Sequence, residues 1–267
     1  MESIYEYKDT DFGLSHTLTP QPDPSIFRLH THAMAELYFF IQGGGVFHIE
    51  GSAYPLERGD LLVLQPAESH YIELDPSQPY ERIVLHFDPE ALRDVDPDGQ
   101  LLAPLFRRTP GKRNLYKPLH FPGGLRQFPE RMLAPLPDPR VSIFAGLLPL
   151  LHEMCRILPT LPEDPSPDTE PVAQRIMRYL NENLEAPITL QSLCSRFYLS
   201  RSQLCRLFRD AAGVTVKQYL TAKRLVRAKQ LLDEGKQPTH VFQECGFSDY
   251  SGFYRAYRSY FGHPPSK

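Results

Sequence analysis

Two segments near the end of the chain share one pattern, and this repeat constrains the fold more than any other feature. The first segment runs from Ile188 to Gly213 and the second from Thr239 to Gly262. Each begins with an apolar helical stretch, breaks for a few residues and restarts at a serine. Ser200 and Ser248 can accept hydrogen bonds from the free N–H groups of the next turn, so each marks a second helix. The pattern predicts two helix-turn-helix units, a motif of DNA-binding proteins.

The apolar residues of both segments recur at helical spacing. They are Leu190, Leu193, Phe197, Leu204, Leu207 and Phe208 in the first segment, and Phe253, Tyr257 and Phe261 in the second. Each second helix therefore buries one stripe and leaves another face outside. The outward residues are Arg201, Ser202, Arg206 and Arg209 in the first unit, and Tyr250, Ser251, Tyr254, Arg255 and Arg258 in the second.

The charge of the chain is divided unevenly along its length. From Pro171 onward there are 15 Lys and Arg against 7 Asp and Glu, whereas residues 1–170 hold 14 basic and 25 acidic residues. A basic module joined to an acidic one indicates that only the C-terminal part meets a polyanion. Two alternatives stay open: surface arginines on an ordinary helical bundle, or a protein-interaction module without preference among DNA sequences.

The last hundred residues resemble a known family. The stretch LSRSQLCRLFRDAAGVTVKQYLTAKRLVRAKQLLDEG, followed by CGFSDYSGFYRAYRSYFGHPP, is similar to the DNA-binding domain of AraC-type transcription regulators. The resemblance implies that both second helices enter successive major grooves. It assigns base contacts to Ser202, Cys205, Arg206, Tyr250, Ser251, Tyr254 and Arg255, and phosphate contacts to Arg209 and Arg258. Cys205 is unusual there, and it either touches a thymine methyl group or packs half-buried.

Residues 159–171 read PTLPEDPSPDTEP, with five prolines and no basic residue. Proline at this density cannot continue a helix and favours an extended spacer. We therefore expect an N-terminal domain over residues 1–158, a linker over 159–171 and a DNA-binding domain over 172–267.

The first domain shows strand alternation in place of a helical period. Short β-rich runs (ELYFFIQ, VFHIEG, DLLVLQP, HYIEL and ERIVLHF) are separated by glycine-containing turns, which predicts an antiparallel barrel or sandwich. From about Glu130 to Leu158 the pattern becomes helical, with Val141 and Phe144 among the residues of a broad apolar side. Such a stripe is usually core, but in AraC-type regulators helices after the barrel commonly pair two subunits. The fold class expected is α+β multidomain, a cupin-like antiparallel β-barrel with helices followed by an all-α domain.

One cluster of residues resembles the two motifs of the cupin fold. Matched by position, His30, His32, Glu36 and His70 fill the places that coordinate a divalent metal in cupin enzymes. Three imidazoles and a carboxylate suit zinc, nickel, iron or manganese, so such a metal is the one cofactor the sequence suggests. The alternative is a polar pocket lining without metal, which AraC-type sensor domains often keep.

Strand parity adds further candidates for the lining of a ligand pocket. Tyr38 and Phe40 share parity with Glu36, and Arg82 shares parity with His86. The predicted ligand-binding set is His30, His32, Glu36, Tyr38, His70, Arg82 and His86. Aromatic, cationic and imidazole groups suit a small polar or anionic effector, and the resemblance favours a sugar; ordinary barrel core is the alternative.

The four cysteines, at 155, 194, 205 and 245, show no pairing or metal spacing, and no signal segment or long apolar span is visible. We expect a cytoplasmic, ligand-responsive regulator, more an activator than a repressor by resemblance, and not an enzyme or a membrane protein. Its partners would be double-stranded DNA, a small-molecule effector, RNA polymerase and a second copy of the chain. The competing hypothesis is a metal-dependent cupin enzyme fused to a DNA-binding tail.

Overall fold

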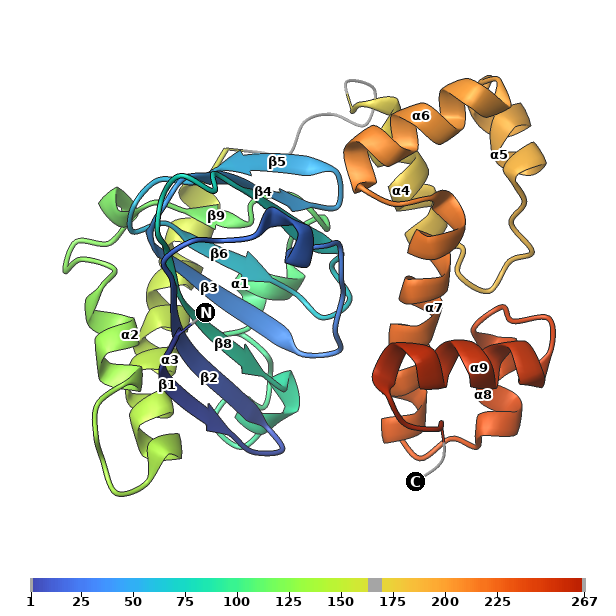
Figure 1. Cartoon of the computed structure of the whole chain (residues 1–267). Helices are drawn as coiled ribbons and strands as arrows, with labels where there is room; N and C mark the ends of the chain where they lie inside the picture. Colours follow the sequence, from blue (N-terminus) through green and yellow to red (C-terminus); the bar gives the residue numbers. More distant parts are fainter. Residues whose placement is uncertain (1, 163–169, 266–267) are drawn as a thin grey trace.

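The computed structural model describes residues 2–162 and 170–265 (Figure 1). The strands are β1 (Glu2–Lys8), β2 (Phe12–Thr19), β3 (Ala35–Gln42), β4 (Gly45–Ile49), β5 (Ser52–Pro55), β6 (Leu61–Leu64), β7 (His70–Leu74), β8 (Tyr80–Phe87) and β9 (Leu115–Tyr116). The helices are α1 (Ala103–Phe106), α2 (Gln127–Met132), α3 (Pro139–Ile157), α4 (Val172–Glu182), α5 (Leu190–Phe197), α6 (Arg201–Ala212), α7 (Val216–Asp233), α8 (Pro238–Glu244) and α9 (Tyr250–Phe261).

The strands form two antiparallel sheets that face each other. The larger has the order β1-β2-β8-β3-β6-β9 and the smaller the order β5-β4-β7. A backbone bridge between His30 and His70 ties the segment before β3 to the smaller sheet. We call the two sheets and their connections the barrel. The five sequence-predicted strands fall on β3, β4, β6, β7 and β8, while the strands β1, β2, β5 and β9 were not predicted.

Period-two alternation gives β3 two different faces. Leu37 and Phe39 point toward α2 and α3 and join the core between sheet and helices. Tyr38 and Phe40 point the other way, into a second core between the two sheets. Glu36 is on this inner face, so the residues expected to bind a ligand are directed into the barrel.

Helix α3 packs across the outer face of the larger sheet (Figure 1). Asp138 caps it by accepting a hydrogen bond from the Arg140 N–H, and Pro139 stands in its first turn. With the short 3-10 turn that follows, α3 is long and apolar enough to cross a membrane by composition alone, but half of that window is buried in this core. The expectation that Val141 lies on the apolar side is wrong, because Val141 is 54% exposed and Ile143 is buried instead.

The C-terminal part is all helical. Helices α4, α5 and α6 surround one apolar core, to which α7 contributes Val216, Tyr219 and Leu220. The far half of α7 contributes Leu225 and Leu231 to a second core with α8 and α9. Helix α7 therefore joins two small helical units, as Figure 1 shows.

Most of the predicted linker, residues 163–169, lies outside the described residues. Its first residues are not an extended spacer: Leu158–Thr160 form a 3-10 turn, and Leu161 is buried in the core of the N-terminal part. Helix α4 begins at Val172, directly after the predicted linker.

Candidate DNA interface and effector pocket

Helices α5 and α6 form the first helix-turn-helix unit. Thr189 caps α5, and α5 ends at Tyr198 in the left-handed conformation, with φ 55° and ψ 41°. Ser200 caps α6: its hydroxyl accepts a hydrogen bond from the Gln203 N–H, and the Gln203 side-chain oxygen accepts one from the Ser200 N–H, which makes a capping box. The prediction of a helix start at Ser200 is confirmed.

Helices α8 and α9 form the second unit. Gly246 adopts φ 75° in the turn between them, as expected of a glycine there. The expectation that Ser248 caps the second helix is wrong by one residue: Asp249 caps α9, and its carboxylate accepts a hydrogen bond of 2.7 Å from the Gly252 N–H. An ionised carboxylate serves this position well, because it also interacts favourably with the helix dipole.

The predicted DNA-contact residues occupy equivalent places on the two helices. In α6 they are Arg201, Ser202, Cys205, Arg206 and Arg209, and in α9 they are Tyr250, Ser251, Tyr254, Arg255 and Arg258. Both sets are the first, second, fifth, sixth and ninth residues of their helix. At 3.6 residues per turn these positions span an arc of about 140°. Each helix thus presents one continuous face that lies beside its buried stripe and overlaps the edge of that stripe at the fifth residue.

The five arginines of these faces are exposed and have no protein partner. Among the described residues, the side chains of Arg201, Arg206, Arg209, Arg255 and Arg258 make no hydrogen bond or ion pair. Other basic residues nearby are paired, such as Lys229 with Asp233 at 2.8 Å. Unpaired guanidinium groups on one surface are suited to phosphates and guanine edges.

Two of the predicted contact residues are partly buried. Cys205 packs against the core of the first unit, which favours the packing role among the two that the sequence left open. Tyr254 is half-buried, and its ring lies 6.3 Å from that of Tyr250. Phe242, from α8, supports Tyr250 in an edge-on contact at 5.8 Å, so the aromatic residues at the start of α9 belong to one cluster.

A cavity of about 160 Å³ lies inside the barrel. Six of the seven residues predicted to bind a ligand line it: His30, Glu36, Tyr38, His70, Arg82 and His86. The seventh, His32, reaches the site through Glu36, since its Nε2 lies 2.7 Å from Glu36 Oε2. At about 30 Å³ per water molecule, the cavity has room for about five waters, which limits it to a small ligand.

Glu36 is the centre of this pocket. Its Oε2 atom lies 3.3 Å from His70 Nε2 and 3.5 Å from His86 Nε2, in addition to the contact with His32. Burial by itself would raise the pKa of the Glu36 carboxyl, but the charges of His70 and His86 and the hydrogen bond from His32 outweigh it and hold the pKa well below its ordinary value. The pocket therefore contains a buried carboxylate rather than a neutral acid.

Three of the pocket histidines are oriented by contacts between one ring nitrogen, Nδ1, and the backbone. The Nδ1 atoms of His30, His32 and His70 lie within hydrogen-bond distance of the backbone carbonyls of Arg28 (3.0 Å), Met34 (2.8 Å) and Glu68 (2.9 Å). A carbonyl can only accept, so each Nδ1 carries a proton; the Nε2 atoms of His30 and His70 are then available toward the cavity, whereas His32 Nε2 is hydrogen-bonded to Glu36. Although the His30 side chain is exposed at the mouth of the cavity, desolvation by the surrounding protein and the neighbouring His70 lower its pKa to about 4, which favours its neutral form.

This arrangement fits a divalent cation. The ligand atoms of His30, His32 and His70 lie within 4.8 Å of one another, as do those of His32, Glu36 and His86. His70 Nε2 is buried and has no hydrogen bond of acceptable geometry, although Glu36 is 3.3 Å away. Imidazoles held by backbone carbonyls through Nδ1 are the usual supports of a metal site.

The opposite wall of the cavity is aromatic and cationic. The Tyr38 and Tyr80 hydroxyls are hydrogen-bonded to each other, and the guanidinium of Arg82 stands 4.8 Å above the Tyr80 ring and 5.6 Å above that of Phe27. Burial raises the pKa of Tyr80 to about 12, so its hydroxyl keeps its proton. This wall offers hydroxyl groups and a positive charge to a polar ligand.

Several residues that line the cavity were not predicted from the sequence: Ser15, Phe27, Phe47, Tyr71, Ile72, Tyr80 and Val84. Tyr80 and Val84 share strand parity with Arg82 and could have been found by that signal. Phe40, which parity did suggest, does not line this cavity. Ser15 lies on β2, a strand that the alternation pattern did not indicate.

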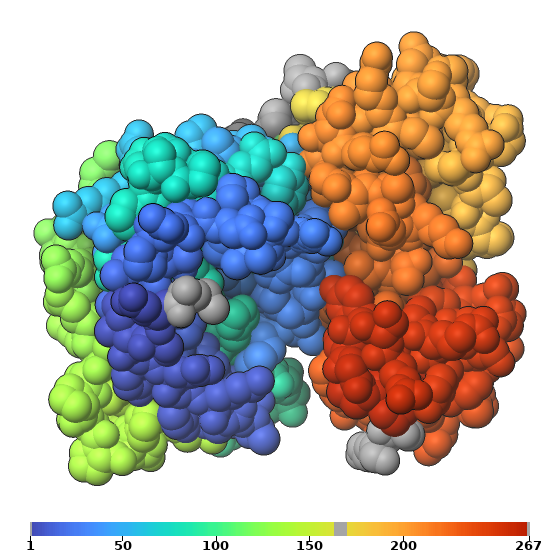
Figure 2. Space-filling model, viewed as in Figure 1, coloured from blue at the N-terminus to red at the C-terminus, as the bar shows by residue number. Residues whose placement is uncertain are grey.

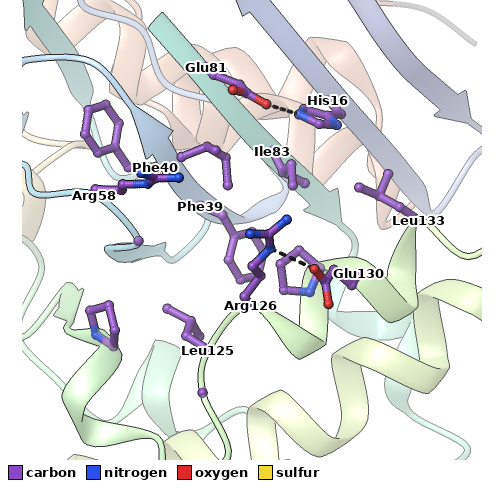
Figure 3. A pocket seen from close by; sticks show the side chains of 15 residues that line it. His16, Phe39, Phe40, Arg58, Glu81, Ile83, Leu125, Arg126, Glu130 and Leu133 are labelled. Atoms are coloured by element: carbon purple, nitrogen blue, oxygen red, sulfur yellow. Dashed lines mark hydrogen bonds and ion pairs between the residues drawn. The ribbon is translucent and has the colours of Figure 1, made fainter.

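A larger groove lies on the outer side of the sheet (Figure 3). It measures about 520 Å³ and runs between the sheet and α2, with Phe39, Ile83, Leu125 and Leu133 in its walls. Its charged rim includes Arg126, which pairs with Glu130 at 2.7 Å. None of the residues predicted to bind a ligand lines this groove. Its mainly apolar walls suit apolar rather than polar molecules.

Comparison with known proteins bears on both parts of the chain. Residues 17–138 match the family model described as the AraC-like ligand binding domain, and residues 193–267 match that of a helix-turn-helix domain. The chain is an AraC-type transcription regulator. As members of this family do, it combines a ligand-binding domain with a DNA-binding domain.

Individual relatives resemble this AraC-type regulator to different extents. The transcriptional activator RhaR of Escherichia coli is 24% identical over 250 residues, 91% of this chain and 86% of its own. The probable transcriptional regulator LumQ of Photobacterium leiognathi is 39% identical over 93 residues, covering 34% of this chain and 38% of its own. The crystal structure of ToxT from Vibrio cholerae aligns with 97% of this chain and 96% of its own, at 11% identity and a TM-score of 0.39.

Proposed function

We propose that this AraC-type regulator is a cytoplasmic, ligand-responsive activator that reads specific DNA through α6 and α9. It acts as a homodimer, contacts RNA polymerase and senses a small polar molecule in the barrel. We assign effector binding to the expected domain of residues 1–158, to whose core Leu161 also belongs, and DNA binding to residues 172–267. Activation is favoured over repression because the similar RhaR is named as an activator.

One observation carries the DNA-binding part of the proposal. The same five helix positions are exposed or half-exposed on α6 and α9, and all five arginines among them are without a protein partner in the described part of the chain. Arg206 and Arg255 hold the same position on the two helices and can each donate two hydrogen bonds to a guanine. Arg209 and Arg258 are the phosphate contacts, which set register and salt dependence.

The test is selection of bound fragments from a random DNA pool with the full chain, followed by affinity measurements at several salt concentrations. Arg206→Ala is expected to relax base preference at one position, by about 1–3 kcal/mol. Arg258→Ala is expected to weaken all sequences alike and to lower the salt slope by about one. Arg126→Ala, an exposed arginine far from both helices, is the control. Equal losses on every sequence for both variants, or no enrichment at all, would favour a protein-interaction module.

The effector part rests on the inner cavity. Its size, the buried Glu36 carboxylate, the imidazoles and Arg82 together favour a small polar or anionic molecule over an apolar one. A sugar remains the class suggested by the family resemblance.

We further propose that a divalent cation binds beside this effector. His30, His32, Glu36 and His70 would hold it, with His86 as an additional ligand from β8. Bound there, it would supply a Lewis-acidic point for an oxygen of the effector. The test is metal analysis of protein purified without a histidine tag, followed by titration with Zn²⁺ and Mn²⁺. One equivalent should bind to the native chain and to the exposed control His152→Ala but not to His70→Ala.

A protein that is isolated without metal and ignores both ions would end the metal proposal and leave a polar pocket. The competing hypothesis, a metal-dependent cupin enzyme, requires in addition that the metal-loaded chain converts a substrate.

A further inference from the structure

The barrel and the DNA-binding helices meet at a buried carboxylate. Glu50, in the turn between β4 and β5, has a side chain that is 3% exposed. Its Oε1 accepts hydrogen bonds from the Ser69 backbone N–H at 2.6 Å and from Lys223 on α7. Its Oε2 accepts from Asn181 on α4 at 3.0 Å and from the Tyr219 hydroxyl on α7. Three side chains of the DNA-binding domain thus converge on one carboxylate of the barrel.

The turn around Glu50 is shaped for this contact. Glu50 has φ 48°, a left-handed conformation that side chains other than glycine rarely adopt. At the next residue, Gly51, an added Cβ would lie 3.0 Å from the Met177 sulfur, so α4 approaches this backbone closely. Gln174 of α4 donates a 2.9 Å hydrogen bond to the Gly51 carbonyl. Figure 2 shows the barrel and the C-terminal helices in contact along one side.

The same contact continues into the wall of the effector pocket. Lys223 donates a second hydrogen bond, to the Ala67 carbonyl, and the Ala67 N–H donates to the His32 carbonyl at 2.8 Å. Ser69, which donates to Glu50, precedes His70 in the chain. The backbone that positions His32 and His70 is therefore bonded directly to the interface.

The second helix-turn-helix unit has its own contact with the pocket. The Tyr260 hydroxyl, at the end of α9, donates a 2.8 Å hydrogen bond to the Thr31 carbonyl. Thr31 is buried and stands between His30 and His32. This contact is a single neutral hydrogen bond, whereas the Glu50 contact is charged, buried and formed by several donors.

The barrel therefore touches both DNA-reading units, the first through α4 and α7 and the second through α9. Two recognition helices can enter successive major grooves only at one relative orientation. A shift of one contact relative to the other changes that orientation.

We propose that the pocket is coupled to DNA binding through these two contacts: Glu50–Lys223 anchors the first unit to the barrel, and Tyr260–Thr31 transmits movement of the His30–His32 segment to the second. The coupling rests on the proposed role of the pocket as effector site. An effector or cation that draws the pocket histidines together displaces the Thr31 carbonyl, and the weaker Tyr260 contact yields while the Glu50 anchor holds.

Hydrogen exchange followed by mass spectrometry tests the contacts on the full chain, without DNA or ligand. Tyr260→Phe should raise amide exchange over residues 28–34 on the order of tenfold, a typical coupling between sites. Lys223→Met should do so over residues 28–34 and 66–71, although the substitution is in the other domain. Tyr254→Phe and Lys229→Met, on the same two helices, are matched controls that should leave both segments unchanged.

The coupling must also work in the opposite direction, because linkage is reciprocal. Glu36→Gln in the pocket should raise exchange over residues 253–261 of α9. On a duplex selected with the native chain, the effects of Glu36→Gln and Tyr260→Phe on affinity should be non-additive, since one route carries both. A contact with only a structural role would give additive effects.

Native exchange in residues 28–34 of a folded Tyr260→Phe variant would overturn the proposal, as would additive effects on DNA affinity. Tyr260→Phe is the deciding variant, because it removes one hydroxyl and is expected to fold even if Lys223→Met does not. If no DNA is selected, the proposed function is rejected. The exchange measurements still decide whether the two contacts are coupled to the pocket.

Discussion

Tyr198, at the turn of the first helix-turn-helix unit, gives a sharp test of the local structure. It adopts φ 55° and ψ 41°, and it is 94% exposed, so its side chain contributes almost no packing. A residue with a Cβ costs about 1–2 kcal/mol in this conformation. Glycine avoids that cost but loses about 0.5–1 kcal/mol more backbone entropy on folding.

Tyr198→Gly should therefore stabilise the DNA-binding domain by about 0.5–1 kcal/mol. For a domain of roughly a hundred residues this corresponds to a rise in melting temperature of about 3–6 °C. Thermal unfolding followed by circular dichroism measures it. Tyr198→Ala is the matched control, since it removes the same exposed ring but keeps the Cβ, and it should stay within about 0.5 kcal/mol of the native chain. If the glycine variant is no more stable than the alanine variant, the strain argument is wrong.

Three further predictions concern stability. Phe208→Ala, at a fully buried position of the first helical core, should cost about 3–5 kcal/mol in denaturant unfolding, and a loss below 1 kcal/mol would contradict the packing described. Ser200→Ala should cost about 1 kcal/mol by removing the cap of α6, with Ser200→Thr as the conservative control that largely retains it. Burial raises the pKa of Glu68, but its ion pair with Arg108 outweighs this and leaves the pKa lowered. The stabilisation from Glu68 is thus complete above the unfolded-state pKa and is lost as pH falls through the folded-state pKa. Glu68→Gln should therefore weaken the fall of the free energy of unfolding at acid pH, and an unchanged fall would refute this.

Much of the DNA-binding domain could be predicted because its signals are local. Helical spacing, the caps and the glycine turns each depend on residues within one or two turns, and the repeat supplied the same signals twice. The one-residue error at Ser248 shows the limit of that approach, because both Ser248 and Asp249 are good caps and only the backbone path selects one.

The pocket could be predicted in part for a different reason. His30, His32 and Glu36 are close in sequence, and strand parity places Arg82 and His86 on one face. Ser15 on β2 and Phe47 on β4 were missed because these strands reach the pocket only through pairing with strands that are distant in the sequence. The weak alternation of β1, which has charged residues at an edge of the sheet, also concealed that strand.

By itself, the sequence determined the two helix-turn-helix pairs, the cap at Ser200, five alternating strands and the residue types of both sites, since these follow from contacts between near neighbours in the chain. The tertiary structure alone decided that Glu50 is buried against Lys223, 173 residues away, and that Tyr260 reaches the backbone between two pocket histidines. The physical reason is that burial of a charge is stable only where a partner and further donors converge on it, and that convergence depends on how the two domains pack.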